Sequence, residues 1–480
     1  MSNSPAIVWL RNDLRLTDNP ALAAAVATGA PLLIVYILEE EGPYARGSAA
    51  RWWLHESLAS LSSDIEKRGG RLTLRRGPAT RELLSLVDET KSAHVFWNRR
   101  YDPIGIKIDT DLKSKLSEQS VDVSSFNGSV LREPWELKTG SGNFYKVYTP
   151  FWKSLQSVGP GRPQPEKAPK KLLAPKTAPA SDSLDAWALK PNAPNWASRF
   201  PDIWQPGEKG AQKRLDAFLD AAVSRYDEDR NAPGIEGTSR LSPHLSFGEL
   251  SPNQVWQATL TLLSSGSIRQ DGAMTFLSEI AWRDFAYNLL YHYPSIGDAP
   301  IKPEFSKFPW RDDDEAFERW TSGQTGVPIV DAGMRQLWQT GWMHNRVRMI
   351  VASYLTKNLM IDWRRGERWF WDCLVDADPA SNTASWQWVA GSGADAAPYF
   401  RIFNPVTQSE KFDASGDYIR KYVPELVGFE GKAIHNPAGA KPAAIEVAGI
   451  SLGTDYPEPL VDLSASRKRA LAAYDHIRAA

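Results

Sequence analysis

The chain has 480 residues and 42% of them are apolar, which is enough for two domains that each bury a core. Its 56 Lys and Arg residues nearly balance 57 Asp and Glu residues, so a nucleic-acid partner would need a local basic face. The single cysteine, Cys373, excludes disulfides within the chain and cysteine-based zinc sites. The histidines lack HExxH or HxxxH spacing, so no metal centre is expected.

No basic segment followed by a long apolar core opens the sequence, so no secretion signal is expected. One uncharged run, ALAAAVATGAPLLIVYIL over residues 21–38, is long enough to be tested as a membrane span. Gly29 and Pro31 interrupt this run, which favours a helix followed by a buried strand. We therefore expect a soluble protein of the cytoplasm that does not enter a membrane.

Short Val-, Ile- and Phe-rich runs alternate with helical patterns over roughly the first quarter of the chain. The predicted strands are AIVWL, LLIVYIL, RLTLRR, HVFWN and VDVSSF. The predicted helices cover residues 19–28, 49–67, 80–89 and 104–116. This alternation predicts a doubly wound parallel sheet of the Rossmann-like kind, which binds ligands at the carboxyl ends of its strands. No strand leads into GxGxxG or a P-loop, so the ligand stays unnamed.

A proline-rich stretch separates this region from the rest of the chain. Residues 159–201 contain nine prolines, a density that predicts an extended connection without regular structure. Long helical patterns follow over residues 210–226, 271–293, 331–340, 345–360 and 367–374. The expected fold class is an α/β domain followed by an all-helical domain. The expected limits are residues 1–131 for the α/β domain, 132–200 for the linker and 201–480 for the helical domain.

The polar segment EGTSRLSPHLSFGELS contains Ser242 followed by Pro243, which predicts an N-cap with proline at the first helical position. Hydroxyls of Thr238 and Ser239, together with Arg240, would surround the start of that helix. Such a helix start suits a phosphate or diphosphate group. A well-capped helix after a polar loop explains the segment equally well.

The pattern LSEIAWRDFAYNLLYHY places Glu279, Trp282 and Arg283 at positions i, i+3 and i+4, on one helix face. A carboxyl group packed on an indole can have its pKa raised, so that it donates a hydrogen bond at neutral pH. The alternative is a surface Glu–Arg pair beside a half-buried tryptophan.

The pattern GWMHNRVRMIVASYL likewise places Asn345, Arg348 and Met349 on one face. Residues 331–370 have seven Lys or Arg against three Asp or Glu, a local basic excess. The candidate phosphate contacts here are Arg346, Arg364, Arg365 and Arg368. Four interleaved tryptophans favour stacking with nucleic acid: Trp342, Trp363, Trp369 and Trp371. The alternative is an ordinary solvated face.

The stretch VDADPASNTASWQW combines Asp376 and Asp378 with small residues and two tryptophans. Buried carboxylates need partners, so we expect a flat group with a polar edge to lie against this loop. The nearby GSGADA, residues 391–396, fits a loose dinucleotide fingerprint. No predicted strand precedes it and Pro398 follows it, so it is discounted.

A set of motifs in a fixed order resembles the photolyase/cryptochrome family across nearly the whole chain. The motifs are RNDLRLTDNPAL, GTSRLSPHLSFGELS, SEIAWRDF, PIVDAGMRQL, TGWMHNRVRM, DWRRGERWF and WQWVAGSGADAAPYFRIFNPVTQSEKFD. The resemblance is to bacterial cyclobutane pyrimidine dimer photolyases, with the class III branch close to plant cryptochromes as one candidate. It implies an α/β antenna domain, a linker and an all-helical domain that binds flavin adenine dinucleotide (FAD).

By the same resemblance, Asp378 would accept a hydrogen bond from the flavin ring, Asp376 would pair with Arg348, and Asn382 would face the flavin N5. The other residues implied at FAD are Tyr226, Thr238, Ser239, Arg240, Leu241, Ser242, Phe276 and Arg283. The implied electron relay to the flavin consists of Trp386, Trp363 and Trp310, with Trp342 and Trp388 as other routes.

The family includes DNA repair enzymes and blue-light receptors, so the resemblance alone leaves two functions open. The residues implied in catalysis are Glu279, Trp282, Asn345, Met349, Asn382 and Trp388. The implied DNA contacts are Arg230, Glu279, Trp282, Asn345, Arg346 and Gln408. These residues favour light-driven splitting of cyclobutane pyrimidine dimers in UV-damaged DNA, by electron transfer from reduced FAD to a flipped-out dimer.

Three comparisons support repair over the alternatives. Plant cryptochromes have aspartate where Asn382 stands, and enzymes for the (6-4) photoproduct have histidines at the positions of Asn345 and Met349. The chain also ends soon after the flavin domain, without the long tail of signalling cryptochromes. The alternative function is a cryptochrome-type blue-light receptor with little or no repair activity.

The antenna region departs from the bacterial folate type. In FWNRRYDPIGIKID the Asn–Glu pair of that type is replaced by Ile104 and Gly105, and the usual histidine partner is missing. We expect a second antenna chromophore and prefer methenyltetrahydrofolate, bound in a different manner, over deazaflavin. We also expect a monomer.

Overall fold

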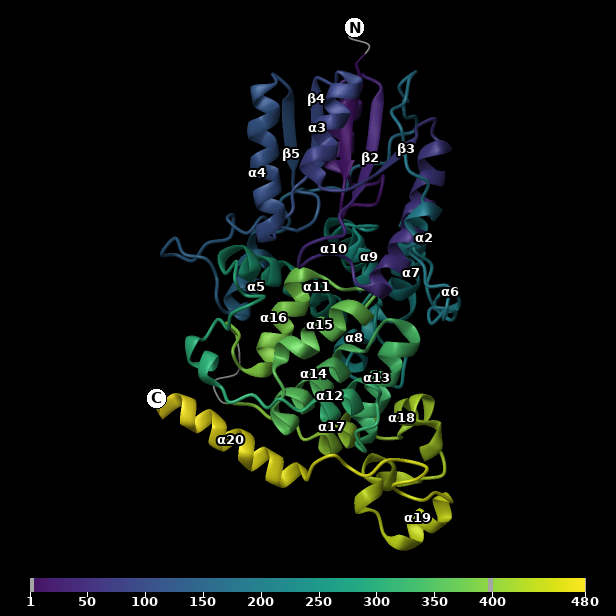
Figure 1. The fold of residues 1–480 in the computed structure, drawn as a ribbon, viewed down its shortest axis with the longest axis vertical. Helices are drawn as coiled ribbons and strands as arrows, with labels where there is room; N and C mark the ends of the chain where they lie inside the picture. The colour runs from purple at the N-terminus through teal and green to yellow at the C-terminus, as the bar shows by residue number, and fades with distance from the viewer. Residues whose placement is uncertain (1–3, 396–399, 480) are drawn as a thin grey trace. The chain divides into compact units, whose positions relative to one another are not determined.

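The computed structural model describes residues 4–395 and 400–479, and Figure 1 shows its elements. The chain forms two compact units. Unit 1 contains Met1–Ser224, Ser239–Pro294 and Val375–Ala380, and unit 2 contains Arg225–Thr238, Ser295–Leu374 and Ser381–Ala480. Because these units follow spatial contacts whereas the expected domains follow the order of the chain, the domain limits at residues 131 and 200 stay a prediction.

A five-stranded parallel sheet organises the first part of unit 1. Its strands are β1 (Ala6–Leu10), β2 (Leu32–Leu38), β3 (Leu72–Arg76), β4 (His94–Asn98) and β5 (Asp122–Phe126). The strand order is β3-β2-β1-β4-β5, and every neighbouring pair is parallel. The order changes direction between β1 and β4, as in doubly wound folds. All five predicted strands are therefore confirmed.

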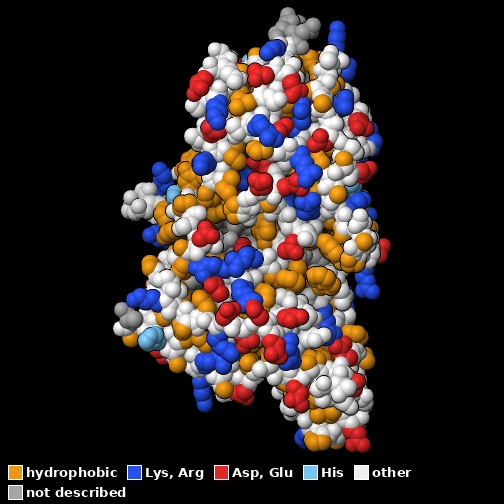
Figure 2. Space-filling view, in the orientation of Figure 1, with side chains coloured by type: hydrophobic (Ala, Val, Ile, Leu, Met, Phe, Trp, Pro, Cys, Tyr) orange, Lys and Arg blue, Asp and Glu red, His pale blue; other side chains and the backbone are white. Residues whose placement is uncertain are grey.

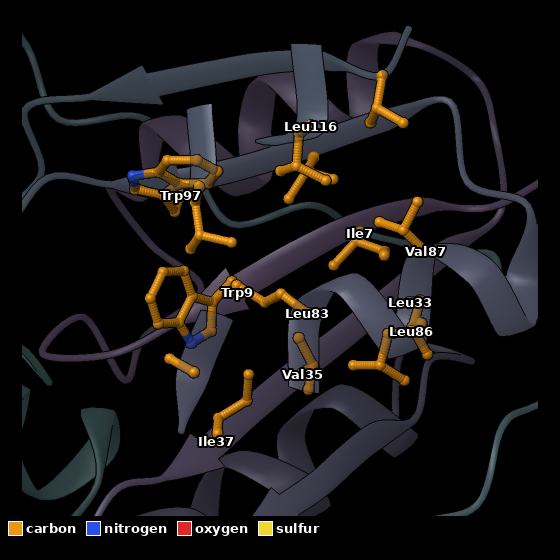
Figure 3. Packing of buried hydrophobic residues seen from close by; sticks show 14 residues of the cluster. Ile7, Trp9, Leu33, Val35, Ile37, Leu83, Leu86, Val87, Trp97 and Leu116 are labelled. Carbon is orange, nitrogen blue, oxygen red and sulfur yellow. The ribbon is translucent and has the colours of Figure 1, made fainter. Parts of the chain in front are cut away.

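The helices between the strands also match the prediction, within two residues at each end. They are α1 (Pro20–Ala27), α2 (Ser48–Glu66), α3 (Ala79–Thr90) and α4 (Pro103–Glu118). Side chains of α3 and α4 pack on one sheet face around Trp9 and Trp97, whose rings meet edge to face at 5.9 Å (Figure 3). The uncharged run of residues 21–38 forms most of α1 and all of β2. Among the described residues, none of the helices is both long and apolar enough to cross a bilayer.

The proline-rich residues 159–201 are mainly irregular, as predicted, with two exceptions. A 3-10 turn, η1 (Asp185–Trp187), interrupts them, and α6 (Phe200–Ile203) begins at their end. The turn buries Trp187, whose Nε1 donates to Asp182 Oδ2 at 2.9 Å. The prediction of a connection without any regular structure is wrong at η1, because a buried indole fixes the backbone between the prolines.

The rest of the described chain is helical, and its strands end with β5. Unit 1 continues with α5 (Tyr148–Val158), α7 (Glu208–Ala221), α9 (Ser242–Ser246), α10 (Pro252–Ser264) and α11 (Gln270–His292), and the turn η2 (Val223–Arg225) starts in unit 1 and ends at the first residue of unit 2. The helices that belong to unit 2 are α8 (Tyr226–Asp229), α12 (Asp314–Thr321), α13 (Pro328–Thr340), α14 (Asn345–Ser353), α15 (Trp363–Cys373), α17 (Pro405–Phe412), α18 (Asp417–Tyr422), α19 (Pro442–Ala448) and α20 (Leu463–Ala479). Helix α16 (Pro379–Ala390) starts in unit 1 and continues in unit 2. Short turns are η3 (Pro303–Lys307), η5 (Pro424–Leu426), η6 (Gly431–His435) and η7 (Pro437–Gly439).

Two predicted helices are divided in the structure. The pattern over residues 345–360 forms α14 and then a π-helical turn, η4 (Tyr354–Leu359). The chain leaves that turn at Met360 with a φ of 56°. The pattern over residues 210–226 ends as α7 at Ala221. The apolar pattern of the sequence is the same whether or not the helix is interrupted, so the pattern could not predict either break.

Candidate cofactor and substrate site

The segment expected to hold a diphosphate forms the short helix α9. The helix begins at Ser242, as predicted, but Ser242 is its first residue rather than its N-cap. Leu241 precedes it with helical backbone angles, and no side chain caps the helix. The predicted serine cap is therefore wrong, because the chain already turns helically before Ser242. Arg214 Nε donates to the Ser239 carbonyl at 2.9 Å, which fixes the loop leading into α9.

The two aspartates of the loop before α16 are buried in unit 1. Asp376 is 7% exposed and Asp378 is 5% exposed. The Ser246 hydroxyl donates to the Ala377 carbonyl at 2.8 Å, which holds the loop against α9. Tyr287 donates to Asp378 Oδ2 at 2.7 Å, and the Ala380 amide donates to Oδ1 at 3.1 Å. The prediction that these carboxylates are buried with partners is confirmed for Asp378, whereas the Asp376–Arg348 pair stays a prediction.

Asn382 of α16 is oriented by a residue that sequence reasoning missed. Its Nδ2 donates to the Glu367 backbone carbonyl at 3.1 Å and to Glu367 Oε1 at 2.9 Å. A carbonyl can only accept, so the amide nitrogen must face Glu367 and Oδ1 must point elsewhere. Thr383 also donates to Glu367 Oε1, at 3.4 Å. Burial raises the pKa of Glu367, although these hydrogen bonds oppose the shift. Asn382 therefore presents an acceptor, not a donor, on its other side.

Helix α11 presents Glu279, Trp282 and Arg283 on one face, as their spacing predicts. The Trp282 indole is half-buried and lies parallel to the ring of Tyr148, with centroids 3.7 Å apart and an interplanar angle of 10°. The Tyr148 hydroxyl in turn hydrogen-bonds Ser278 of α11 through the backbone carbonyl and Oγ. The Tyr148 ring therefore packs against one face of the Trp282 indole and fixes the orientation of the indole plane.

Two other predicted cofactor residues of unit 1 have defined partners. Phe276 packs against Phe218 with ring centroids 4.6 Å apart. Arg283 donates to the Ser129 carbonyl, and its guanidinium lies 4.9 Å from the centre of the Tyr287 ring. In unit 2, Tyr226 is buried and Arg230 lies over its ring at 5.6 Å.

Helix α14 carries the second predicted cluster. Asn345 is exposed, and Arg348 and Met349 are half-buried on the same face. Arg348 Nε donates to the Met343 carbonyl at 2.8 Å, and its guanidinium lies 5.9 Å from the Trp342 ring. These contacts fix the direction in which Arg348 leaves the helix. The structure therefore confirms the shared face, while the roles of the three side chains stay predictions.

The candidate DNA contact Arg346 is held by two residues that its own motif does not contain. Its Nη2 donates to Asn231 Oδ1 at 2.6 Å, and its guanidinium lies 4.4 Å from the ring of Phe412. Phe412 ends α17, the helix that also carries the half-buried Gln408. Arg346 and Gln408 are thus linked through α17, which sequence spacing does not reveal.

Two other arginines proposed for phosphate contacts have local partners. Arg364 forms an ion pair with Asp362 at 2.8 Å. Arg365 forms ion pairs with Asp314 at 2.6 Å and with Asp312 at 3.3 Å. These carboxylates offset the positive charge, so Arg364 and Arg365 are weaker candidates for phosphate than the sequence predicts. Arg368 is exposed.

The three tryptophans of the implied relay lie in unit 2. Trp386 and Trp363 are buried, whereas Trp310 is partly exposed. Trp386 packs against Phe370 at 5.0 Å and against the buried Trp320 at 6.3 Å. Trp388 is half-buried on the same helix as Trp386. The progression from buried to exposed indoles agrees with a relay toward solvent, and the order of electron transfer stays a prediction.

The start of α4 explains why the antenna motif departs from the folate type. Asp102 caps the helix by accepting from the Gly105 amide at 2.8 Å, and it also binds Arg100 through both carboxylate oxygens. A Cβ at Gly105 would lie 2.8 Å from Asp102 Oδ2 and collide with the Arg100 side chain. A side chain at this position would therefore require the Arg100 and Asp102 side chains to shift.

Two remaining features of the sequence are the end of the last motif and the expected absence of a metal centre. Residues 396–399 of the last motif, and with them the end of GSGADA, are outside the described residues. Among the described residues, no group of three or more His, Cys, Asp or Glu side chains is arranged to hold a metal ion.

Comparison with known families finds two matches that together span most of the chain. Residues 276–476 match the FAD binding domain of DNA photolyase, and residues 6–170 match the family described as DNA photolyase.

Comparison with individual proteins gives full-length similarity. A deoxyribodipyrimidine photo-lyase of Agrobacterium fabrum is 54% identical over 100% of this chain and 99% of its own length. Cryptochrome-1 of Arabidopsis thaliana is 35% identical over 98% of this chain and 70% of its own length. The crystal structure of a bacterial class III photolyase from Agrobacterium tumefaciens superimposes with a TM-score of 0.96, at 54% identity, covering 100% of this chain and 99% of that one.

Proposed function

The chain belongs to the photolyase/cryptochrome family, and we propose that it is a deoxyribodipyrimidine photo-lyase that splits cyclobutane pyrimidine dimers in UV-damaged DNA with light. The observation that carries this proposal is the face of α11. There Trp282 is half-buried and stacked on Tyr148, and Glu279 lies one helical turn away. A rigid aromatic platform beside a carboxyl group suits a flat, carbonyl-bearing pyrimidine pair.

FAD is the cofactor that the matched domain implies, and the described side chains fit it. In unit 1, the buried carboxylate of Asp378 is an acceptor for a ring N–H. In unit 2, Asn382 has its amide nitrogen engaged by Glu367, so its Oδ1 suits the N5–H of a reduced flavin. When bound and reduced, FAD supplies the electron that opens the cyclobutane ring after absorbing light.

The chain's own residues bind the damaged bases and stabilise the charge that forms on them. Trp282 and Trp388 stack on a dimer that is flipped out of the duplex. The free-energy cost of flipping is lowered because damaged bases stack and pair poorly. We propose that a protonated Glu279 donates a hydrogen bond to a thymine carbonyl and stabilises the negative charge there. Asn345 and Met349 complete the contacts to the dimer. Arg230, Arg346 and Gln408 bind the DNA backbone, which is supported by the contacts of Arg346 with Phe412 of α17 and with Asn231.

The tryptophans of unit 2 restore the reduced cofactor. We place Trp386 first and Trp363 second on the family resemblance, and Trp310 last because it is partly exposed whereas the other two are buried. Indole is readily oxidised and packs well in a core, so these tryptophans can pass an electron inward from a reductant dissolved in the solvent, which is oxidised in the process.

The decisive experiment illuminates the purified, reduced protein with an oligonucleotide that contains a thymine dimer and follows the return of thymine absorbance. Light-dependent recovery supports the repair function. Dimer binding and a normal flavin spectrum without recovery would assign the protein to the light-receptor class, which the similarity to a plant cryptochrome makes the second candidate.

A variant tests the role of Glu279 within this function. Glu279→Gln keeps the size of the side chain and weakens the hydrogen bond to the charged carbonyl, so the repair yield per photon should fall several-fold. Flavin absorbance should stay unchanged, because Glu279 does not belong to the residues placed at FAD. A repair yield equal to that of the wild type would contradict the role.

The antenna chromophore and the state of the protein in the cell complete the proposal. We favour methenyltetrahydrofolate over deazaflavin, with a binding mode that does not use position 105, because a side chain there would collide with Arg100 and Asp102. The absorption spectrum of the native holoprotein distinguishes the two chromophores. We also propose a monomer in the cytoplasm, which size-exclusion chromatography and cell fractionation test.

A further inference from the structure

Tyr287 is a residue of α11 that none of the roles above includes. It lies one helical turn after Arg283 and is 6% exposed. Its hydroxyl donates to Asp378 Oδ2 at 2.7 Å, while the Ala380 amide donates to the other oxygen at 3.1 Å. The carboxylate proposed to face the flavin is therefore held at both oxygens, and Tyr287 is the side chain that holds one of them.

The ring of Tyr287 is fixed independently of its hydroxyl. The guanidinium of Arg283 lies 4.9 Å from the ring centroid, and the ring of Tyr101 meets it edge to face at 6.3 Å and 76°. Because these contacts involve only the ring, phenylalanine at this position should keep them. The structure thus separates the packing role of the residue from its hydrogen bond.

The hydroxyl donates throughout the accessible pH range. Burial, together with the negative charge of Asp378, raises the pKa of Tyr287 well above its ordinary value, so the hydroxyl stays protonated. A donor to a carboxylate draws negative charge toward itself, and in a buried site of low polarity this effect reaches neighbouring groups. Less negative charge then remains at the oxygen edge that faces a ligand.

We propose that Tyr287 is a positioning residue that acts through Asp378 to raise the reduction potential of bound FAD. This inference rests on the FAD site of the proposed function. Reduction adds negative charge to the flavin, and a bare carboxylate beside the ring opposes that charge. The Tyr287 hydroxyl weakens the opposition by sharing the charge of Asp378, and it fixes the angle at which the carboxylate meets the ring N–H.

The test uses the FAD-loaded protein and the variant Tyr287→Phe. The midpoint potential of the flavin should move to more negative values, and the FAD dissociation constant should rise several-fold. Tyr291→Phe is the matched control, because Tyr291 lies one turn further along α11 and contacts the ring of Trp135, outside the proposed site. The control should leave both quantities unchanged.

A vibrational measurement separates positioning from a general structural role. The carboxylate band of Asp378 is the infrared band that Asp378→Asn removes, and this band should shift in Tyr287→Phe but not in Tyr291→Phe. An unshifted band, or an unshifted potential in a variant that binds FAD, would overturn the inference.

The same preparations distinguish this inference from the proposed function. Wild-type protein that repairs dimers while Tyr287→Phe keeps the wild-type potential leaves the function standing and removes the role of Tyr287. A shifted potential in a protein that repairs no dimer supports the role of Tyr287 in a flavoprotein of another function.

Discussion

Gly366 of α15 illustrates how a missing side chain can define the position of a functional one. A Cβ at Gly366 would overlap the indole of Trp386 and lie 2.6 Å from Leu355 Cδ2. Glycine inside a helix costs about 0.5–1 kcal/mol relative to alanine. Glycine is nevertheless required here, because the indole of Trp386, the proposed first member of the relay, occupies the space that a Cβ at position 366 would need.

We therefore expect Gly366→Ala to destabilise the protein by about 1–3 kcal/mol, as overpacked cores do, despite the better helix propensity of alanine. Photoreduction of the flavin should also slow, because Trp386 must move. Chemical denaturation and flavin photoreduction measure the two effects. Gly297→Ala is the control, since a Cβ there meets nothing within 4 Å. Equal stability of the two variants would mean that Trp386 is free to shift.

At this scale the sequence predicts candidate site residues but not what holds them. Asp378 stands out because a carboxylate among small residues and tryptophans needs a partner, whereas Asn382 is singled out by the family resemblance. Their partners Tyr287 and Glu367 are 91 and 15 positions away in the chain, and each belongs to an ordinary helical pattern. Only the fold brings these pairs together, so no local signal could have identified them.

Among the elements, α11 connects the proposed substrate face to the segment that follows the sheet. Asp284 of α11 is 3% exposed, and its Oδ2 accepts from the Leu131 amide at 2.7 Å and the Arg132 amide at 3.1 Å. Its Oδ1 has no hydrogen-bond partner among the residues that the structure describes. Burial outweighs Arg283 and the two amides and raises the pKa of Asp284 from 3.8 to about 7.

This shift predicts how stability changes with pH. The folded protein keeps a proton on Asp284 between pH 3.8 and about 7, whereas the unfolded chain releases it. Folding therefore binds a proton, and the contribution of Asp284 to stability falls as pH rises through that window, by on the order of 1 kcal/mol per pH unit. It is fully present below the window and lost above it.

The variant Asp284→Asn measures this contribution, because asparagine keeps an acceptor for the amides and does not titrate. The difference in unfolding free energy, wild type minus variant, should decrease from pH 5 to 7 and level off above about pH 8. Denaturant titrations at each pH give this difference. A constant difference would show that Asp284 is already ionised at pH 5.

Element types were predictable where packing imposes a simple period. β1 and β2 are apolar runs and β3 to β5 are shorter mixed segments, and all five alternate with helical patterns, so β1 to β5 and α1 to α4 follow from pattern alone. The π-helical turn η4 and the uncapped start of α9 were not predictable. Both depend on backbone geometry that tertiary contacts select, and the amino acids at those positions suit the ordinary alternatives equally well.

At the scale of the whole molecule, basic and acidic residues are nearly equal in number. Basic and acidic side chains are interspersed over the face shown in Figure 2, in agreement with the net charge of -1. A chain with so little net charge has a weak overall field, so we expect binding to DNA to depend on local basic contacts. The salt dependence of binding should be correspondingly shallow, with a slope that counts those contacts.

Arg346→Ala should weaken DNA binding about equally for damaged and undamaged sequences and lower the salt slope by about one. The reason is that Arg346 is oriented by Asn231 and Phe412 and is proposed to contact the backbone. Binding isotherms at several salt concentrations give the slope. Arg319→Ala serves as the control, because Arg319 donates to the carbonyls of Gln324 and Glu458. Equal slopes for both variants would remove Arg346 from the contacts.

The composition of unit 1 has a consequence for how the protein is made. Six of its residues, Val375–Ala380, come from far beyond the rest of the unit in the chain, and they include both buried aspartates. A ribosome must therefore complete more than three quarters of the polypeptide before unit 1 can close, so its maturation during translation is late despite an early sheet. Capture of FAD by a nascent chain would then report that synthesis has passed this loop.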